Sequence, residues 1–115
     1  MIELTTHVLD TTHGVPAAGM RIRLFATGDG AVLATAETDS GGRARIAPAH
    51  DGILEAGSYD LIFSSGMYFS ERGIDEAAPR FLDEVVIRIG LRREIAHYHV
   101  PLLISPFGYT TYRGQ

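Results

Sequence analysis

Short segments in which apolar and polar residues alternate, separated by turn residues, recur along nearly the whole chain. In the segment 20–26 the apolar Met20, Ile22 and Leu24 fall on one side, and the segment 59–64 shows the same period. Alternation with a period of two places the apolar side chains on one face of a β-strand. Many short strands at close spacing, with polar turns, are typical of a sandwich or a barrel. The sequence therefore predicts an all-β fold of antiparallel strands.

This pattern predicts roughly seven or eight strands and one short helix. The expected strands cover residues 2–9, 20–26, 31–38, 43–47, 59–64, the C-terminal part of 81–89, 97–104 and 109–113. The helix candidate is 70–78, where acidic residues and two alanines precede Pro79. The stretch 10–19, which contains two glycines and a proline, is expected to be a loop. No repeat or linker divides the chain, so we expect a single domain over residues 1–115.

The composition argues against several classes of protein. The chain has 115 residues, a formal net charge of −4 and no basic run, which argues against a nucleic-acid partner. It has no cysteine, so disulfide bonds and thiolate chemistry are excluded. No apolar run approaches the roughly 18 residues of a membrane-spanning helix, and Met1 leads directly into the first expected strand without a secretory leader. We therefore expect a cytoplasmic protein with no membrane partner.

The C-terminal segment carries two histidines on one face of a strand. Alternation places His97 and His99 together, and a Ser-Pro-Phe-Gly turn at 105–108 predicts a hairpin with the segment 109–113. Histidine titrates naturally near neutral pH, so such a pair is a candidate for acid–base chemistry. The alternative is that both imidazoles are half-buried in the sheet, with their nitrogens bonded to neighbours.

The other histidines differ in their surroundings. His7 lies in the middle of the first expected strand, whereas His13 and His50 lie in loop-like segments and are expected to be solvated. His7 could join His97 and His99 around a metal ion, but no carboxylate has a comparable spacing. We therefore expect no metal and no other cofactor.

Two arginines are candidates for binding an anion or an amide. Arg43 directly follows a tight Gly41-Gly42 turn, and Arg113 lies close to the C-terminus. A guanidinium in such a place can bind a planar group through two hydrogen bonds, although a plain surface charge is the commoner case. No G-x-S-x-G elbow and no phosphate-binding glycine loop accompanies them. If the chain is an enzyme, we expect acid–base chemistry with water as the nucleophile.

Several sequence blocks together resemble one family. They are LTTHVLD at 4–10, GVPAAG at 14–19, TDSGGR at 38–43, HYHVPLL at 97–103 and GYTTYRG at 108–114. In this order they are similar to the motifs of the transthyretin-like 5-hydroxyisourate hydrolases of purine breakdown. The resemblance spans nearly the whole chain, and the two C-terminal blocks are its most specific part.

The resemblance implies a transthyretin-like sandwich of two four-stranded antiparallel sheets with one short helix. It also implies a homotetramer, a dimer of dimers with active sites in the channel between the dimers, and 5-hydroxyisourate as the small-molecule substrate. The residues that match the catalytic positions of the family are His7, Arg43 and His99. In the implied mechanism a neutral histidine activates water, and Arg43 stabilises the charge that develops on the carbonyl oxygen. The sequence leaves open whether His7 or His99 is the base.

The end of the chain matches the family's terminal Y-R-G-S at Tyr112, Arg113 and Gly114, which implies that these residues bind substrate. Gln115 stands where the family has serine, and is expected to help position the substrate. Its amide donates and accepts hydrogen bonds as a hydroxyl does, but the side chain is longer. Two alternatives therefore stay open: a hydrolase of the same fold for another heterocycle, and a non-enzymatic binder of small ligands, as transthyretin is.

Overall fold

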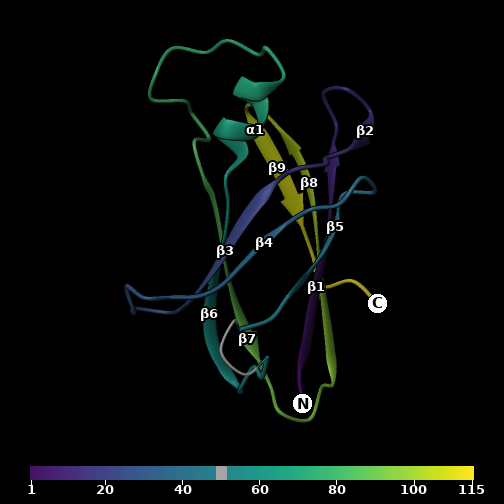
Figure 1. Ribbon diagram of the computed structural model, residues 1–115, viewed down its shortest axis with the longest axis vertical. Coiled ribbons are helices and arrows are strands. Elements are labelled where there is room, and N and C mark those ends of the chain that lie inside the picture. Colours follow the sequence, from purple (N-terminus) through teal and green to yellow (C-terminus); the bar gives the residue numbers. More distant parts are fainter. Residues whose placement is uncertain (49–51) are drawn as a thin grey trace.

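In the computed structural model of the protein, which describes residues 1–48 and 52–115, two β-sheets face each other and a short helix lies at one end (Figure 1). The strands are β1 (Glu3–Asp10), β2 (Val15–Pro16), β3 (Arg21–Ala26), β4 (Val32–Glu37), β5 (Arg43–Ile46), β6 (Gly57–Phe63), β7 (Val85–Leu91), β8 (His97–Ser105) and β9 (Gly108–Thr111). The helix is α1 (Ser65–Glu71). The predicted sandwich with one short helix is confirmed.

The first sheet has the order β2-β1-β8-β9, and β5 pairs with β1 beside β2. It differs from the expectation in two details. The two-residue β2, which falls in the expected loop 10–19, makes this a sheet of five strands rather than four. In addition, β1 and β8 run parallel, and the long connection that parallel strands require contains every strand of the second sheet, together with β2 and β5.

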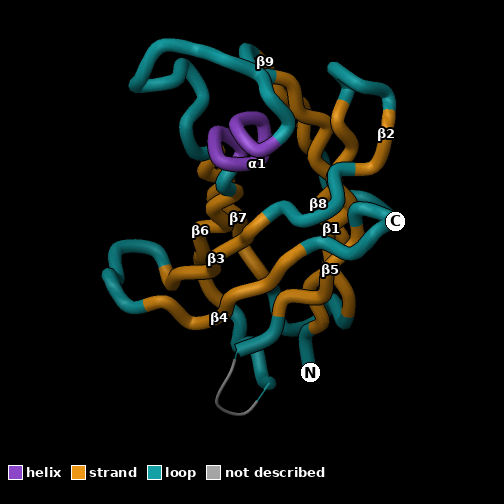
Figure 2. Tube along the Cα trace, turned by 45° about the horizontal axis from the view of Figure 1, so that its top comes forward, coloured by secondary structure: helices purple, strands orange, loops and turns teal. Residues whose placement is uncertain are grey.

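The second sheet is antiparallel, with the order β4-β3-β6-β7. Figure 2 shows its orange strands as a layer beside β1, β5 and β8. The core lies between the two layers, and the alternation predicted for 20–26 and 59–64 is confirmed there. The fully buried side chains from these layers include Leu4, Val8, Met20, Ile22, Leu24, Leu61, Phe63, Leu102 and Ile104.

The helix lies earlier in the chain than expected. It covers Ser65–Glu71, whereas the predicted segment 70–78 is mostly loop. Tyr68 and Phe69 are each 1% exposed. Their packing against the core stabilises the helix at this position, which local helix propensity alone does not predict. Gly73, with φ of 76°, then ends it in a left-handed conformation. No helix among the described residues is long and apolar enough to cross a bilayer.

Candidate active site

The outer face of the five-stranded sheet gathers polar residues from three strands. In the register of β1 with β5, His7 lies opposite Arg43, and in the register of β1 with β8, Thr5 lies opposite His99. The residues that alternate with Thr5 and His7 on β1 are buried, so these two side chains point away from the core. The three expected catalytic residues His7, Arg43 and His99 therefore share one face, in two neighbouring rows of the sheet.

A tight turn fixes Arg43 at the start of β5. The Asp39 carboxylate accepts hydrogen bonds from the backbone N–H groups of Gly41 and Arg43, both at 2.9 Å. The N–H of Arg43 contributes most to holding the pKa of the Asp39 carboxyl below its ordinary value. Gly42 has φ of 77°, and a Cβ there would lie 2.4 Å from the carbonyl oxygen of Val8. Glycine at this position therefore lets the turn approach β1 closely.

A cavity of about 360 Å³, which we call the first lobe, opens on this face beside β1, β5 and β8. It is lined by Thr5, Thr6, Asp39, Arg43, Ala44, Arg45, His97, His99 and Gln115. Its size is in the usual range for sites that bind small ligands. Three expected site residues, Arg43, His99 and Gln115, meet in this cavity. His7 does not line it, although its charge acts on His99.

A second lobe of about 310 Å³ adjoins the first. Its lining consists of Ile95, His97, His99, Arg113, Gly114 and Gln115. Since His97, His99 and Gln115 line both lobes, they separate Arg43 on one side from Arg113 on the other. Within the part of the chain that the structure describes, neither guanidinium has a hydrogen-bond or ion-pair partner. Both arginines therefore remain free to bind a ligand.

Gly114 lies directly against the His99 imidazole. Its N–H donates a hydrogen bond of 2.7 Å to the His99 carbonyl oxygen. A Cβ on Gly114 would stand 2.7 Å from the Cδ2 of His99, so the glycine makes room for the ring. Tyr112 lies elsewhere: it is 58% exposed and lines a separate cavity with residues of β7. The structure thus brings Gly114 and Gln115 to the histidines, but not Tyr112.

The Thr5 hydroxyl bridges the two histidines of β8. Its Oγ1 lies 2.8 Å from the Nε2 of His97 and 2.8 Å from the Nδ1 of His99. His99 is half-buried, and this burial, followed by the charges of Arg43, His97 and His7, lowers the pKa of its imidazole. The neutral form of His99 is therefore favoured near neutral pH, as a general base requires.

The sequence patterns do not single out Thr5 or Asp39 as members of this site. Alternation does place Thr5 on the same face as His7, but it does not reveal that β1 pairs with β8, which brings Thr5 to a histidine 94 residues away. The signal for Asp39 was its position before a Ser-Gly-Gly turn, where aspartate commonly bonds to backbone N–H groups. Asp39 both lines the first lobe and accepts a hydrogen bond from the backbone N–H of Arg43.

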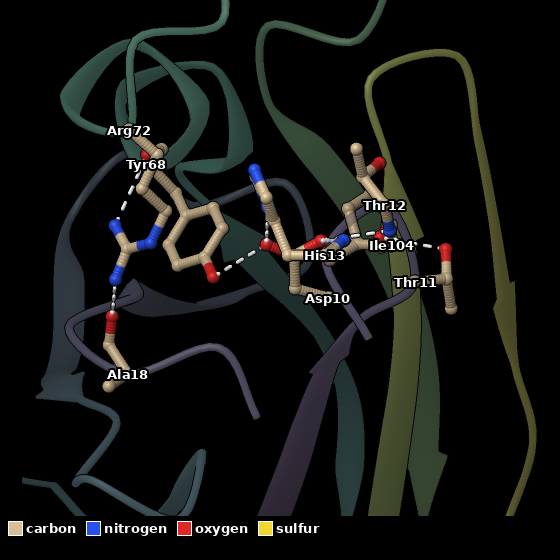
Figure 3. A network of polar contacts seen from close by, with 8 residues as sticks. All are labelled: Asp10, Thr11, Thr12, His13, Ala18, Tyr68, Arg72 and Ile104. Atoms are coloured by element: carbon tan, nitrogen blue, oxygen red, sulfur yellow. Dashed lines mark hydrogen bonds and ion pairs between the residues drawn. The ribbon is translucent and has the colours of Figure 1, made fainter. Parts of the chain in front are cut away.

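His13, which lies outside the site, has different surroundings from those expected. His13 is not simply solvated, because its Nδ1 lies 2.6 Å from an oxygen of Asp10, whose side chain is completely buried. The same oxygen accepts a hydrogen bond from the Tyr68 hydroxyl, and the Arg72 guanidinium lies over the Tyr68 ring (Figure 3). His50 lies outside the described residues. Within the described ranges, no group of three His, Asp or Glu side chains is arranged to hold a metal ion.

Comparisons with known proteins agree with one another over nearly the whole chain. A family model described as the HIUase/Transthyretin family matches residues 4–114. The 5-hydroxyisourate hydrolase of Mesorhizobium japonicum is 49% identical over 115 residues, which cover 97% of this chain and 91% of that protein. The structure of the 5-hydroxyisourate hydrolase of Klebsiella pneumoniae matches with a TM-score of 0.81 and 32% identity over 100% of both chains. An (S)-allantoin synthase structure matches with a TM-score of 0.84 and 36% identity over 97% of this chain, which spans only 43% of that protein.

Proposed function

Because the chain belongs to the HIUase/transthyretin family, we propose that it is a 5-hydroxyisourate hydrolase. Water adds to a ring carbonyl of the substrate, the cyclic amide C–N bond breaks, and 2-oxo-4-hydroxy-4-carboxy-5-ureidoimidazoline is released. The observation that carries this proposal is the first lobe, in which Arg43 and His99 meet. The full-length similarity to hydrolases of this name supports the same substrate.

His99 is the proposed general base. It lines the first lobe, and its lowered pKa, due first to burial and then to Arg43, keeps a neutral imidazole available to take a proton from water. His7 does not line the cavity and lies opposite Arg43 in the sheet. We therefore propose that His7 helps to place the Arg43 guanidinium and does not itself take the proton.

Arg43 is proposed to stabilise the oxyanion that forms when water attacks the carbonyl carbon. Its guanidinium lines the first lobe without a partner among the described residues, so its N–H groups are free to bind the carbonyl oxygen. Arg45 lines the same lobe but pairs with Glu3 at 3.4 Å. Removing one such donor typically costs about 10²–10³ in kcat.

The terminal segment is proposed to position the heterocycle. Gln115 borders both lobes, and its amide can donate and accept hydrogen bonds, while Arg113 binds from the second lobe. Within one chain Tyr112 faces a different cavity, so a role in substrate binding requires a neighbouring subunit. We propose a cytoplasmic homotetramer, a dimer of dimers, as the assembly that supplies it. Light scattering of the eluting protein in gel filtration tests that assembly.

The hydrolase activity can be tested on substrate generated in place. Urate and a uricase supply 5-hydroxyisourate, and its absorbance is followed with and without the protein. We expect decay faster than the spontaneous rate, lost in His99→Ala and Arg43→Ala and kept in Arg93→Ala, which changes an exposed arginine that lines neither lobe.

Decay at the spontaneous rate would contradict the proposal. In that case, turnover restored by Gln115→Ser would indicate an enzyme retuned for another heterocycle. Saturable binding of an aromatic ligand without turnover would indicate a binder.

A further inference from the structure

We propose that Thr5 and His97 form a proton relay with His99, in which Thr5 positions the tautomer of His99 and His97 holds the proton between the two halves of the reaction. The proposal rests on the hydrolase function proposed above. It starts from an arrangement that neither the sequence motifs nor the cavity alone explains: one hydroxyl lies 2.8 Å from a ring nitrogen of each histidine.

The single proton of a hydroxyl allows two hydrogen-bond patterns along this chain of groups. In the base pattern, the Nδ1–H of His99 donates to Thr5, and Thr5 donates to the Nε2 of His97. The Nε2 of His99 then keeps its lone pair and can accept a proton. In the acid pattern every bond is reversed. The Nε2–H of His97 donates to Thr5, and Thr5 donates to the Nδ1 of His99. His99 then carries its proton on Nε2. The Thr5 hydroxyl thus couples the tautomers of the two rings.

Hydrolysis uses the two patterns in turn. The Nε2 of His99 takes a proton from water as the water oxygen bonds to the carbonyl carbon. The Nδ1 proton of His99 passes to Thr5, and the Thr5 proton passes to the Nε2 of His97, which becomes an imidazolium in the acid pattern.

The second half of the reaction reverses these transfers. The Nε2 proton of His99 goes to the leaving ring nitrogen as the C–N bond breaks. The proton on the Nε2 of His97 returns to Thr5, and the Thr5 proton returns to the Nδ1 of His99. One proton has then moved from water to the leaving nitrogen, and the base pattern is restored.

The charges around the two rings favour holding the proton on His97. Burial, and then the positive charge of Arg43, disfavours a second proton on His99 and lowers its pKa. The side chain of His97 is 49% exposed to water, and a Glu3 carboxylate oxygen lies 3.8 Å from its Nε2. Glu3 also pairs with Arg45, and among the described residues it is the only side-chain carboxylate within ion-pair distance of either ring. The charged and titratable groups around the pair are Glu3, His7, Asp39, Arg43, Arg45 and Arg113.

Two substitutions at Thr5 separate a relay from a simple packing contact. Thr5→Val keeps the shape of the side chain and removes the hydroxyl, whereas Thr5→Ser keeps the hydroxyl. We expect Thr5→Val to lower kcat on the order of 10- to 100-fold with little change in KM, as loss of a group that supports acid–base catalysis would. Thr5→Ser should restore most of the lost kcat. Thr35→Val, at an exposed threonine of β4 that lines neither lobe, is the matched control and should leave kcat unchanged.

A substitution at His97 tests the holding of the proton. His97→Gln retains an amide that can hydrogen-bond to Thr5, but it cannot carry an extra proton. We expect a loss of kcat similar to that of Thr5→Val, and an altered acid limb in the pH profile of kcat. A wild-type kcat and pH profile in both His97→Gln and Thr5→Val would overturn the relay while leaving the hydrolase function intact.

Nitrogen-15 NMR of the histidine rings provides a readout that does not depend on turnover. In the free protein we expect His99 to be protonated on Nδ1, with Nε2 bare. In Thr5→Val we expect the proton to shift toward Nε2, and in Thr5→Ser to remain on Nδ1. Wild-type His99 protonated on Nε2 would overturn the proposal. Absence of hydrolysis together with the expected NMR pattern would instead contradict the hydrolase function, so the two failures are distinguishable.

Discussion

The two ends of β1 carry polar clusters of opposite character. Near the start of the strand lies the open cluster, which consists of Thr5, His7, Arg43 and His99. At the end of the strand lies the closed cluster, which consists of Asp10, His13, Tyr68 and Arg72 (Figure 3). The open cluster borders a cavity, whereas the members of the closed cluster bond chiefly to one another and to nearby backbone.

In the closed cluster the Asp10 carboxylate is saturated with donors. One oxygen accepts the backbone N–H groups of Thr12 at 2.9 Å and His13 at 3.0 Å, and the other accepts the His13 ring and the Tyr68 hydroxyl. Burial acts to raise the pKa of Asp10, but the hydrogen bonds from His13 and Tyr68 outweigh it and hold that pKa below its ordinary value. Burial, and then the bond to Asp10, raises the pKa of Tyr68 to about 12.

What a polar cluster can do depends on which of its hydrogen-bonding groups have no partner within the protein. Arg72 lies 3.6 Å above the Tyr68 ring and donates to the Ala18 carbonyl at 2.6 Å. Its guanidinium is therefore already bonded within the protein. Arg43 has no such partner in the described ranges and faces the cavity. We expect damage to the closed cluster to appear as lost stability, and damage to the open cluster as lost turnover.

The largest effect should come from replacing one histidine in each cluster. His99→Gln should lower kcat/KM by about 10²–10⁴, because the proposed general base is removed, with little change in the free energy of unfolding. His13→Gln should leave kcat/KM unchanged and lower the free energy of unfolding by about 1–2 kcal/mol, because a bond to a buried carboxylate is lost. The substrate-decay assay and urea unfolding measure the two quantities. Similar kinetic losses in both variants would contradict the comparison.

Arginine replacements should separate the clusters almost as clearly. Arg43→Lys keeps the charge but loses the forked donors, and kcat should fall about 10²-fold. Arg72→Lys should keep kcat and lower the free energy of unfolding by about 1 kcal/mol, because the stacking on Tyr68 is weakened. Wild-type kcat in Arg43→Lys would show that a point charge is sufficient at this position.

Two aspartates allow the same comparison for carboxylates. Asp10→Asn should lower the free energy of unfolding by about 3 kcal/mol, since several donors lose a charged and buried acceptor. Asp39→Asn alters an exposed turn, so it should act mainly on kcat through the position of Arg43. Urea unfolding and the decay assay should therefore rank these two variants in opposite orders.

The clusters should also respond to pH in different ranges. The pKa of Asp10 lies below its ordinary value of 3.8, so its contribution to stability is present above that value and is lost as pH falls through the lower folded value. The pKa of His99 is lowered from 6.5, so the acid limb of kcat/KM should have its midpoint below pH 6.5. A midpoint at or above 6.5 would contradict the assignment of His99 as the base.

The smallest effect is expected from a single hydroxyl. Tyr68→Phe removes the bond of 2.9 Å to Asp10 and should lower the free energy of unfolding by about 1 kcal/mol, without changing kcat. Tyr112→Phe is the exposed counterpart and should leave stability unchanged. A loss in Tyr68→Phe as large as that in Asp10→Asn would place most of the stability of the closed cluster in this one bond.

The strands were predictable because each buries one side of an alternating segment, as Met20, Ile22 and Leu24 illustrate. The helix was misplaced because its position is decided by the burial of Tyr68 and Phe69, which are distant in sequence from the residues they pack against. Composition favoured 70–78, but tertiary packing outweighed propensity.

The candidate site was likewise only partly predictable from the sequence. Arg43 and His99 could be proposed from local motifs, since a turn and an alternating strand set their positions. Thr5 gains its importance from the parallel pairing of β1 with β8, which no local pattern encodes. The hydrogen bond between Asp10 and His13 could not be predicted from the sequence, because no local pattern shows that the carboxylate three residues before this loop histidine is buried.

The parallel pairing of β1 with β8 also has a consequence for the order in which the protein is made. On the ribosome, β1 emerges early, and β2 and β5 soon occupy one of its edges. Its other edge stays unpaired until β8 has been made, since His99 of β8 follows Thr5 by 94 residues. Until then that edge is open to wrong partners, and so distant a pairing is slow to form. A nascent chain that ends before β8 thus carries Thr5, His7 and Arg43 without His99, so the candidate site is assembled only when the last long-range pairing of the first sheet has formed.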